Sequence, residues 1–194
     1  MKKVLLILLV LSLKANNVLS IEPDVFVQST VNRASQVLSK DISKEKKINQ
    51  LKSIAKETVD IRGVGFYSLG SARTNLNNNQ KIQYSKLFES YFLKSFSSRL
   101  AEYTNPEIEV TNKKVLNENY TIVNSLLVGT SERPEVKIDW RVYTKNPKNP
   151  LIRDLIIEGL SLARTQKEEF SSILNSNDGD INALFKTLEE FSQN

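Results

Sequence analysis

The sequence predicts an α+β protein, in which helices precede an antiparallel sheet and two more helices follow it. Apolar side chains recur at helical spacing through the first hundred residues. From Val136 to Tyr143, apolar and polar residues alternate with a period of two, which is typical of a strand with one buried face. After Gly159 a helical pattern begins again. This order of elements favours a sheet that has helices both before it and after it in the chain.

Length and composition suit a single globular domain. The chain has 194 residues, of which 40% are hydrophobic and 25% charged, enough to bury a core. It contains no Cys and no His. These absences exclude disulfides, thiol nucleophiles, His-based catalytic triads and metal sites with Cys or His ligands. We therefore expect no catalytic residues of these kinds, no metal and no cofactor.

The net charge of +5 is concentrated at the start of the chain. Lys2, Lys3 and Lys14 lie within residues 1–20, which hold no Asp or Glu. The rest of the chain is nearly balanced, so its charge gives no basis for binding nucleic acid.

Residues 1–20 are predicted to be a signal peptide. A basic start is followed by an apolar run, Val4 to Leu13, which is too short to span a bilayer but suits the apolar region of a signal peptide. Val18 and Ser20 suit cleavage after Ser20. Residues 21–194 would then be exported as one domain. An uncleaved anchor or a buried core helix is the alternative.

The first half of the mature chain, residues 23–104, is predicted to be helical. Apolar spacing indicates a helix over 23–39 with Pro23 in its first turn. Ser43 is a good N-cap for a second helix over about 44–59.

The longest predicted helix begins after Asn77 and runs to about Tyr103. Asn77 and Gln80 have the spacing of a capping box. Four aromatic residues on this helix lie four positions apart, on one stripe: Tyr84, Phe88, Phe92 and Phe96. Such a stripe is more often core than ligand site, but its breadth also suits the wall of an apolar cavity.

Residues 107–159 are predicted to form a curved antiparallel sheet. Four strands joined as a meander are expected, at 107–110, 117–128, 136–143 and 151–158. C-terminal helices are expected within residues 160–191. Three acids lie in the last two strands: Asp139, Asp154 and Glu158. They are best interpreted as part of the scaffold, although a general acid/base role is a possible alternative.

The last two strands carry the residues of a family resemblance. The segments EVKIDWRVY and RDLIIEGLSLARTQKEEFSSIL closely resemble the signature of the MlaC, or toluene-tolerance, family. The matching positions are Asp139-Trp140-Arg141, Asp154, Glu158-Gly159, Ser161-Leu162 and Phe170. Leu69-Gly70 and the segment from Gly179 to Leu184 resemble further parts of the pattern. The chain departs from it at Pro150, at Arg153 and in the Asn-rich spacer before the long helix.

The resemblance implies a fold and a role. Members of this family are periplasmic phospholipid-binding proteins of Gram-negative bacteria. Their fold is a nuclear-transport-factor-like cone, in which helices wrap a curved four-stranded sheet around an apolar cavity. They carry phospholipid between an outer-membrane lipoprotein complex and an inner-membrane ABC transporter, which retains outer-membrane lipid asymmetry. The bound phospholipid is cargo and not a cofactor.

The expected lipid site lies between the 84–103 helix and the apolar face of the sheet. The headgroup is expected near solvent, so that specificity is for acyl chains more than for headgroups. The lining is expected to comprise Tyr67, Phe88, Phe92, Phe96, Ile138, Trp140, Leu155 and Ile157. If Trp140 lies opposite Asp154, then Ile152 and Ile156 replace Leu155 and Ile157.

Two alternatives remain: an exported enzyme on the same fold that uses Asp139, Asp154 or Glu158, and an interaction module with a solid core and no ligand.

Overall fold

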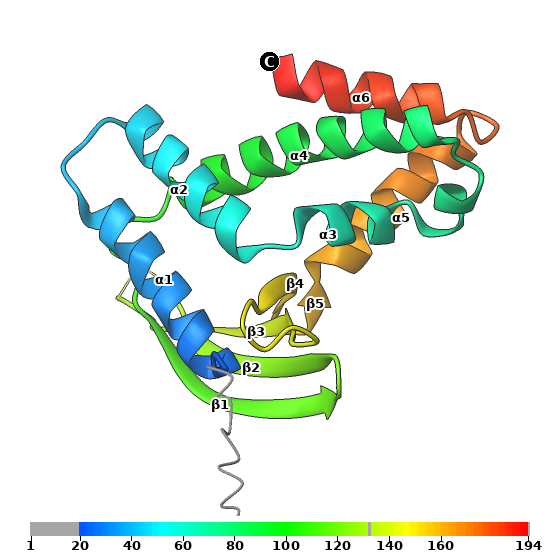
Figure 1. Cartoon of the computed structure of the whole chain (residues 1–194). Coiled ribbons are helices and arrows are strands. Elements are labelled where there is room, and N and C mark those ends of the chain that lie inside the picture. The colour runs from blue at the N-terminus through cyan, green and yellow to red at the C-terminus, as the bar shows by residue number, and fades with distance from the viewer. Residues whose placement is uncertain (1–19, 132, 194) are drawn as a thin grey trace, which may run out of the picture.

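The computed structural model describes residues 20–131 and 133–193 (Figure 1). The predicted signal peptide, apart from Ser20, lies outside these residues. The described residues form six α-helices, one short 3-10 helix and one open antiparallel sheet. The prediction of an α+β protein is therefore confirmed. No helix in 20–131 or 133–193 has the length and apolar character needed to cross a bilayer.

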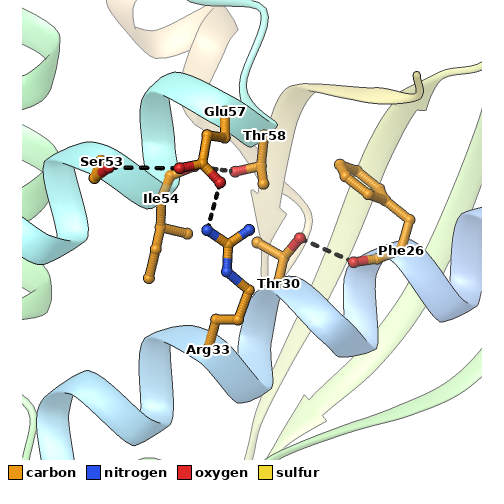
Figure 2. A network of polar contacts seen from close by, with 7 residues as sticks. All are labelled: Phe26, Thr30, Arg33, Ser53, Ile54, Glu57 and Thr58. Atoms are coloured by element: carbon orange, nitrogen blue, oxygen red, sulfur yellow. Dashed lines mark hydrogen bonds and ion pairs between the residues drawn. The ribbon is translucent and has the colours of Figure 1, made fainter.

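The first two helices, α1 (Pro23–Ser39) and α2 (Lys44–Thr58), begin and end close to their predicted limits. The Ser43 side chain accepts a hydrogen bond from the Lys46 amide, as an N-cap does. Figure 2 shows the polar contact between the helices, where Arg33 of α1 points at Glu57 of α2 (2.5 Å). Both side chains are largely exposed, so this ion pair contributes at most about 1 kcal/mol. The firmer contact is an apolar cluster of Val37, Leu38, Leu51 and Ile54.

Helix α3 (Ile61–Ser68) lies within the predicted helical half, in an apolar segment for which the sequence analysis named no separate helix. The Asp60 carboxylate caps it by accepting from the Gly63 amide (2.8 Å). Position 65 requires glycine because the ring of Phe88 packs against its backbone, and a Cβ atom there would lie 2.7 Å from that ring. A 3-10 helix, η1 (Gly70–Thr74), leads on to the next helix.

Helix α4 (Asn78–Leu100) is the longest, and the predicted capping box of Asn77 and Gln80 is present. The helix ends at Leu100 and not near Tyr103. Beyond it, Asn105 takes a positive φ of 46° directly before Pro106, which turns the chain toward the sheet.

The sheet is a meander in the order β1 (Ile108–Asn117), β2 (Tyr120–Leu127), β3 (Val136–Tyr143), β4 (Leu151–Ile157) and β5 (Leu160–Ser161). The expected number of four strands was wrong by one, because the two residues of β5 pair with the end of β4. Strand β1 is longer than predicted. Its second half is mostly exposed and shows no alternation of burial, and it includes the exposed apolar residues Val115 and Leu116. Figure 1 shows the β1–β2 ribbon bending.

The register of β3 and β4 places Trp140 opposite Leu155 and Ile138 opposite Ile157. A register shift between Arg141 and Val142 then places Val142 opposite Ile152. Both Ile152 and Leu155 consequently pack with the residues on the inner face of the sheet.

The elements form two packed groups. Helices α5 (Leu162–Asn175) and α6 (Ile181–Gln193) pack with α3 and α4 around a cluster that includes Tyr84, Phe88, Phe170 and Leu184. Helix α1 packs on β1 and β2 around a second cluster that includes Val27, Val31, Val123, Trp140 and Val142. In Figure 1, α4 and α6 run side by side at the top and the sheet lies below them.

Candidate functional site

A cavity of about 190 Å³ lies where the helical group meets the sheet. Phe88, Phe92 and Phe96 of α4 line one side, and Trp140 of β3 with Ile152 and Leu155 of β4 line the other. The remaining lining residues come from the α2–α3 region, the rest of α4, the middle of β4 and the first part of α5: Val59, Val64, Tyr91, Ser95, Arg99, Arg153, Asp154, Leu162, Ala163, Thr165, Gln166 and Glu169. Most of the wall is apolar, which suits a hydrocarbon ligand.

The wall formed by α4 is an aromatic stripe. Because Phe88, Phe92 and Phe96 lie four residues apart, their side chains share one helix face. Phe92 stacks on Phe96 with ring centroids 5.4 Å apart, and Phe88 lies 6.1 Å from Phe92. Phe88 is buried in the helical core, whereas Phe92 and Phe96 remain half-buried at the cavity. The stripe thus supplies both core and cavity wall.

A second stripe on α4 is polar. Tyr91, Ser95 and Arg99 are also four residues apart, and all three line the cavity. The Tyr91 hydroxyl donates to the side-chain oxygen of Gln166 on α5 (2.9 Å), and Gln166 in turn donates to Glu169 (2.9 Å). Burial raises the pKa of Tyr91, so the hydroxyl keeps its proton at neutral pH. The sequence analysis missed this stripe, although its spacing matches that of the Phe stripe.

Trp140 is held in place on the sheet side. It is the only Trp in the sequence, and 8% of it is exposed. Its indole Nε1 donates to Ser125 Oγ on β2 (2.8 Å), and that hydroxyl donates to the carbonyl of Ile138 (3.0 Å). The buried polar atoms are satisfied, and the apolar ring lines the cavity.

The structure brings together five of the predicted lining residues: Phe88, Phe92, Phe96, Trp140 and Leu155. That they contact lipid stays a prediction. The other three, Tyr67, Ile138 and Ile157, are not part of this cavity lining. Tyr67, 40% exposed, lines a shallow surface groove along α5, because Val64 and not Tyr67 is on the cavity side of α3. Ile138 and Ile157 pair with each other two residues further along the strands than Trp140 and Leu155, and neither lines the cavity.

Arg153 joins the two packed groups at the cavity. Its guanidinium contacts Asp60 Oδ2 through Nε (2.7 Å) and Nη2 (2.6 Å), and donates to the Tyr120 hydroxyl (2.6 Å). The guanidinium also lies 3.8 Å from the ring centre of Tyr143. Burial opposes the charge of Arg153, but the hydrogen bonds to Tyr120 and Asp60 outweigh it and raise its pKa. The Asp60 amide donates to the carbonyl of Ile152 (2.9 Å), which strengthens this link between α3 and β4.

The three strand acids each have a structural partner. Asp154 is buried and accepts from Ser161 Oγ (2.6 Å) and from the Ala163 amide (3.0 Å), which fixes the start of α5. Asp139 accepts from Asn124 (2.7 Å), and Glu158 accepts from the Lys137 amide (2.5 Å). Among residues 20–131 and 133–193, no three side chains are grouped as ligands for a metal ion.

Comparison with known proteins found a matching family model and matching solved structures. The family model described as MlaC protein matches residues 28–190. A solved structure, the phospholipid-binding protein from Ralstonia solanacearum in complex with a phospholipid, superposes with a TM-score of 0.75 at 19% identity. The superposition covers 89% of this chain and 98% of that chain. At this identity the likeness shows a shared fold. A search of curated proteins found no match.

Proposed function

Because this chain belongs to the MlaC family, we propose that it is a phospholipid carrier whose cargo inserts its acyl chains between α4 and the β3–β4 face of the sheet. The observation that carries this proposal is the mostly apolar cavity at that place. The fold likeness to a protein solved with a bound phospholipid supports it. The overall architecture we propose is the nuclear-transport-factor-like cone expected from the family.

The energetics favour firm binding of hydrocarbon. Each buried CH₂ group contributes about 0.8 kcal/mol, so an acyl chain gains far more from this cavity than a headgroup gains at its rim. The cavity of about 190 Å³ is smaller than the roughly 300–1,000 Å³ typical of ligand sites. Two acyl chains therefore require α4 and α5 to move away from β3 and β4.

Transport is the role that this binding would serve. After cleavage of the signal peptide, residues 21–194 would work in the periplasm. The carrier would exchange phospholipid between an outer-membrane lipoprotein complex and an inner-membrane ABC transporter, and so retain outer-membrane lipid asymmetry. Since burial of two chains holds the cargo firmly, release requires a partner that widens the cavity.

The alternatives have less support. An enzyme would need Asp139, Asp154 or Glu158 to meet a substrate, and each of these acids is bonded to its own scaffold. An interaction module without a ligand would need no apolar cavity. We therefore propose a binding and transport protein without catalytic residues or a cofactor.

Purification without detergent tests the proposed function. We expect the protein expressed in a Gram-negative host to retain phospholipid, because the buried chains cannot leave without opening the cavity. Native mass spectrometry should show a mass increment of one two-chain phospholipid, and solvent extraction should release the same lipid. Protein that carries no phospholipid, and takes none from vesicles, would overturn the proposal.

A further inference from the structure

Two opposite charges stand at the polar side of the cavity. Arg99 ends the polar stripe of α4, and Glu169 lies on α5; both line the cavity and both are exposed. No contact within ion-pair distance joins them, and neither belongs to any of the ion pairs among the residues that the structure describes. The cavity therefore opens beside one cation and one anion that are available to a ligand.

Both charges belong to the same rim. The pKa of the Tyr91 hydroxyl depends mainly on burial, which raises it, and on the hydrogen bond to Gln166, which lowers it. Both rim charges also act on this pKa: the carboxylate of Glu169 raises it and the guanidinium of Arg99 lowers it. Glu169 is also oriented, since one of its oxygens accepts from Gln166, which Tyr91 holds. The other cation in the lining, Arg153, is already engaged by Asp60 and Tyr120.

We infer that this rim selects zwitterionic headgroups, with Arg99 meeting the lipid phosphate and Glu169 meeting the ammonium group of a phosphoethanolamine. The inference rests on the proposed function and adds a headgroup preference to it. A guanidinium pairs well with a phosphate, and a carboxylate attracts an ammonium but repels a second anion. An anionic headgroup such as phosphoglycerol would satisfy Arg99 but offer Glu169 only hydroxyl groups and no cationic partner.

The preference is small beside the contribution of the acyl chains. Exposed charge pairs change an equilibrium by about two- to fivefold. Chain burial therefore still dominates affinity, and the rim charges set the ratio in which lipids of equal chain length are carried.

The test is a competition for loading. The full mature chain is incubated with vesicles of equimolar phosphatidylethanolamine and phosphatidylglycerol that carry identical acyl chains, re-isolated, and its bound lipid quantified by mass spectrometry. We expect the wild type to favour phosphatidylethanolamine by about two- to fivefold. Glu169→Gln should bring the ratio toward one, and Glu169→Lys should reverse it in favour of phosphatidylglycerol.

Arg99 should behave differently, because both lipids carry a phosphate. Arg99→Gln is expected to weaken loading of both lipids by a similar factor and to leave their ratio nearly unchanged. Glu168→Gln and Arg164→Gln are matched controls, because both residues are exposed on α5 and line the separate surface groove. Neither variant should change the amount of bound lipid or the ratio of the two lipids.

The outcomes separate the two proposals. If the wild type carries no lipid at all, both the proposed function and the headgroup inference are overturned. If the wild type carries both lipids in equal amounts and Glu169→Lys leaves that ratio unchanged, only the headgroup inference is overturned. Thermal melts of each variant confirm that the fold is retained, as expected for exposed positions.

Discussion

Replacing Ser95 with tryptophan is expected to lower phospholipid loading at least tenfold. Ser95 is a small, half-buried residue in the polar stripe of α4, and it lines the cavity. An indole at this position would occupy the space that an acyl chain needs, because the cavity measures only about 190 Å³. Loading is measured as the fraction of protein that carries lipid in native mass spectra after incubation with vesicles.

Ser90→Trp is the matched control for this variant. Ser90 is on the same helix but is exposed, and it is not part of the cavity lining. This variant should load lipid as the wild type does. Equal loading of Ser95→Trp and Ser90→Trp would mean that lipid binds somewhere other than between α4 and the sheet.

Replacing Phe88 with alanine is expected to lower the free energy of unfolding by about 3–5 kcal/mol. Phe88 is 2% exposed and lies within 6.2 Å, between ring centres, of Tyr84, Tyr91, Phe92 and Phe170. Its removal would leave a void at the centre of the helical core. At roughly 2–4 °C per kcal/mol for a chain of this size, the midpoint of thermal unfolding should fall by about 10 °C.

Ile82→Ala is the control for the loss of Phe88. Ile82 is also on α4 but is largely exposed, so its truncation should change the free energy of unfolding by about 0.5 kcal/mol or less. Denaturant titration measures both values. A loss below about 1 kcal/mol for Phe88→Ala would contradict its place at the centre of the core.

Local signals in the sequence predicted much of the fold. The capping box of Asn77 and Gln80 involves only residues within four positions of each other. The alternation of apolar and polar residues in β3 likewise indicates by itself that one face of the strand is buried. These features depend on near neighbours in the chain, and both are present in the structure. The Phe stripe of α4 was predicted in the same way, from helical spacing alone.

Features that depend on distant partners were not predictable. Helix α3 carries two glycines, and Gly65 is explained only by the approach of Phe88, far along the chain. The shift between β3 and β4 lies beside Arg153, which pairs with Asp60 from another element. Because that shift brings Ile152 inward together with Leu155, neither of the two registers weighed from the sequence described the lining fully.

The polar rim was missed for a different reason. Tyr91, Ser95 and Arg99 have the spacing of a helix face, but that spacing does not say what the face meets. The hydrogen bond from Tyr91 to Gln166 and the contact of the Tyr91 ring with Phe170 show that the stripe meets α5. Tyr67 has the same limitation: its position in the sequence did not show that it lies in the surface groove along α5, while Val64 lines the cavity.

The most direct test of lipid binding at this site uses the only Trp of the chain. Trp140 lines the cavity, and bromine on an acyl chain quenches indole fluorescence at contact distance. The mature chain is loaded with a phosphatidylethanolamine brominated midway along one acyl chain, or with the same lipid without bromine. We expect the brominated lipid to quench Trp140 strongly relative to the unbrominated one. Equal fluorescence, with mass spectrometry showing both lipids bound, would contradict the claim that acyl chains lie between α4 and the sheet.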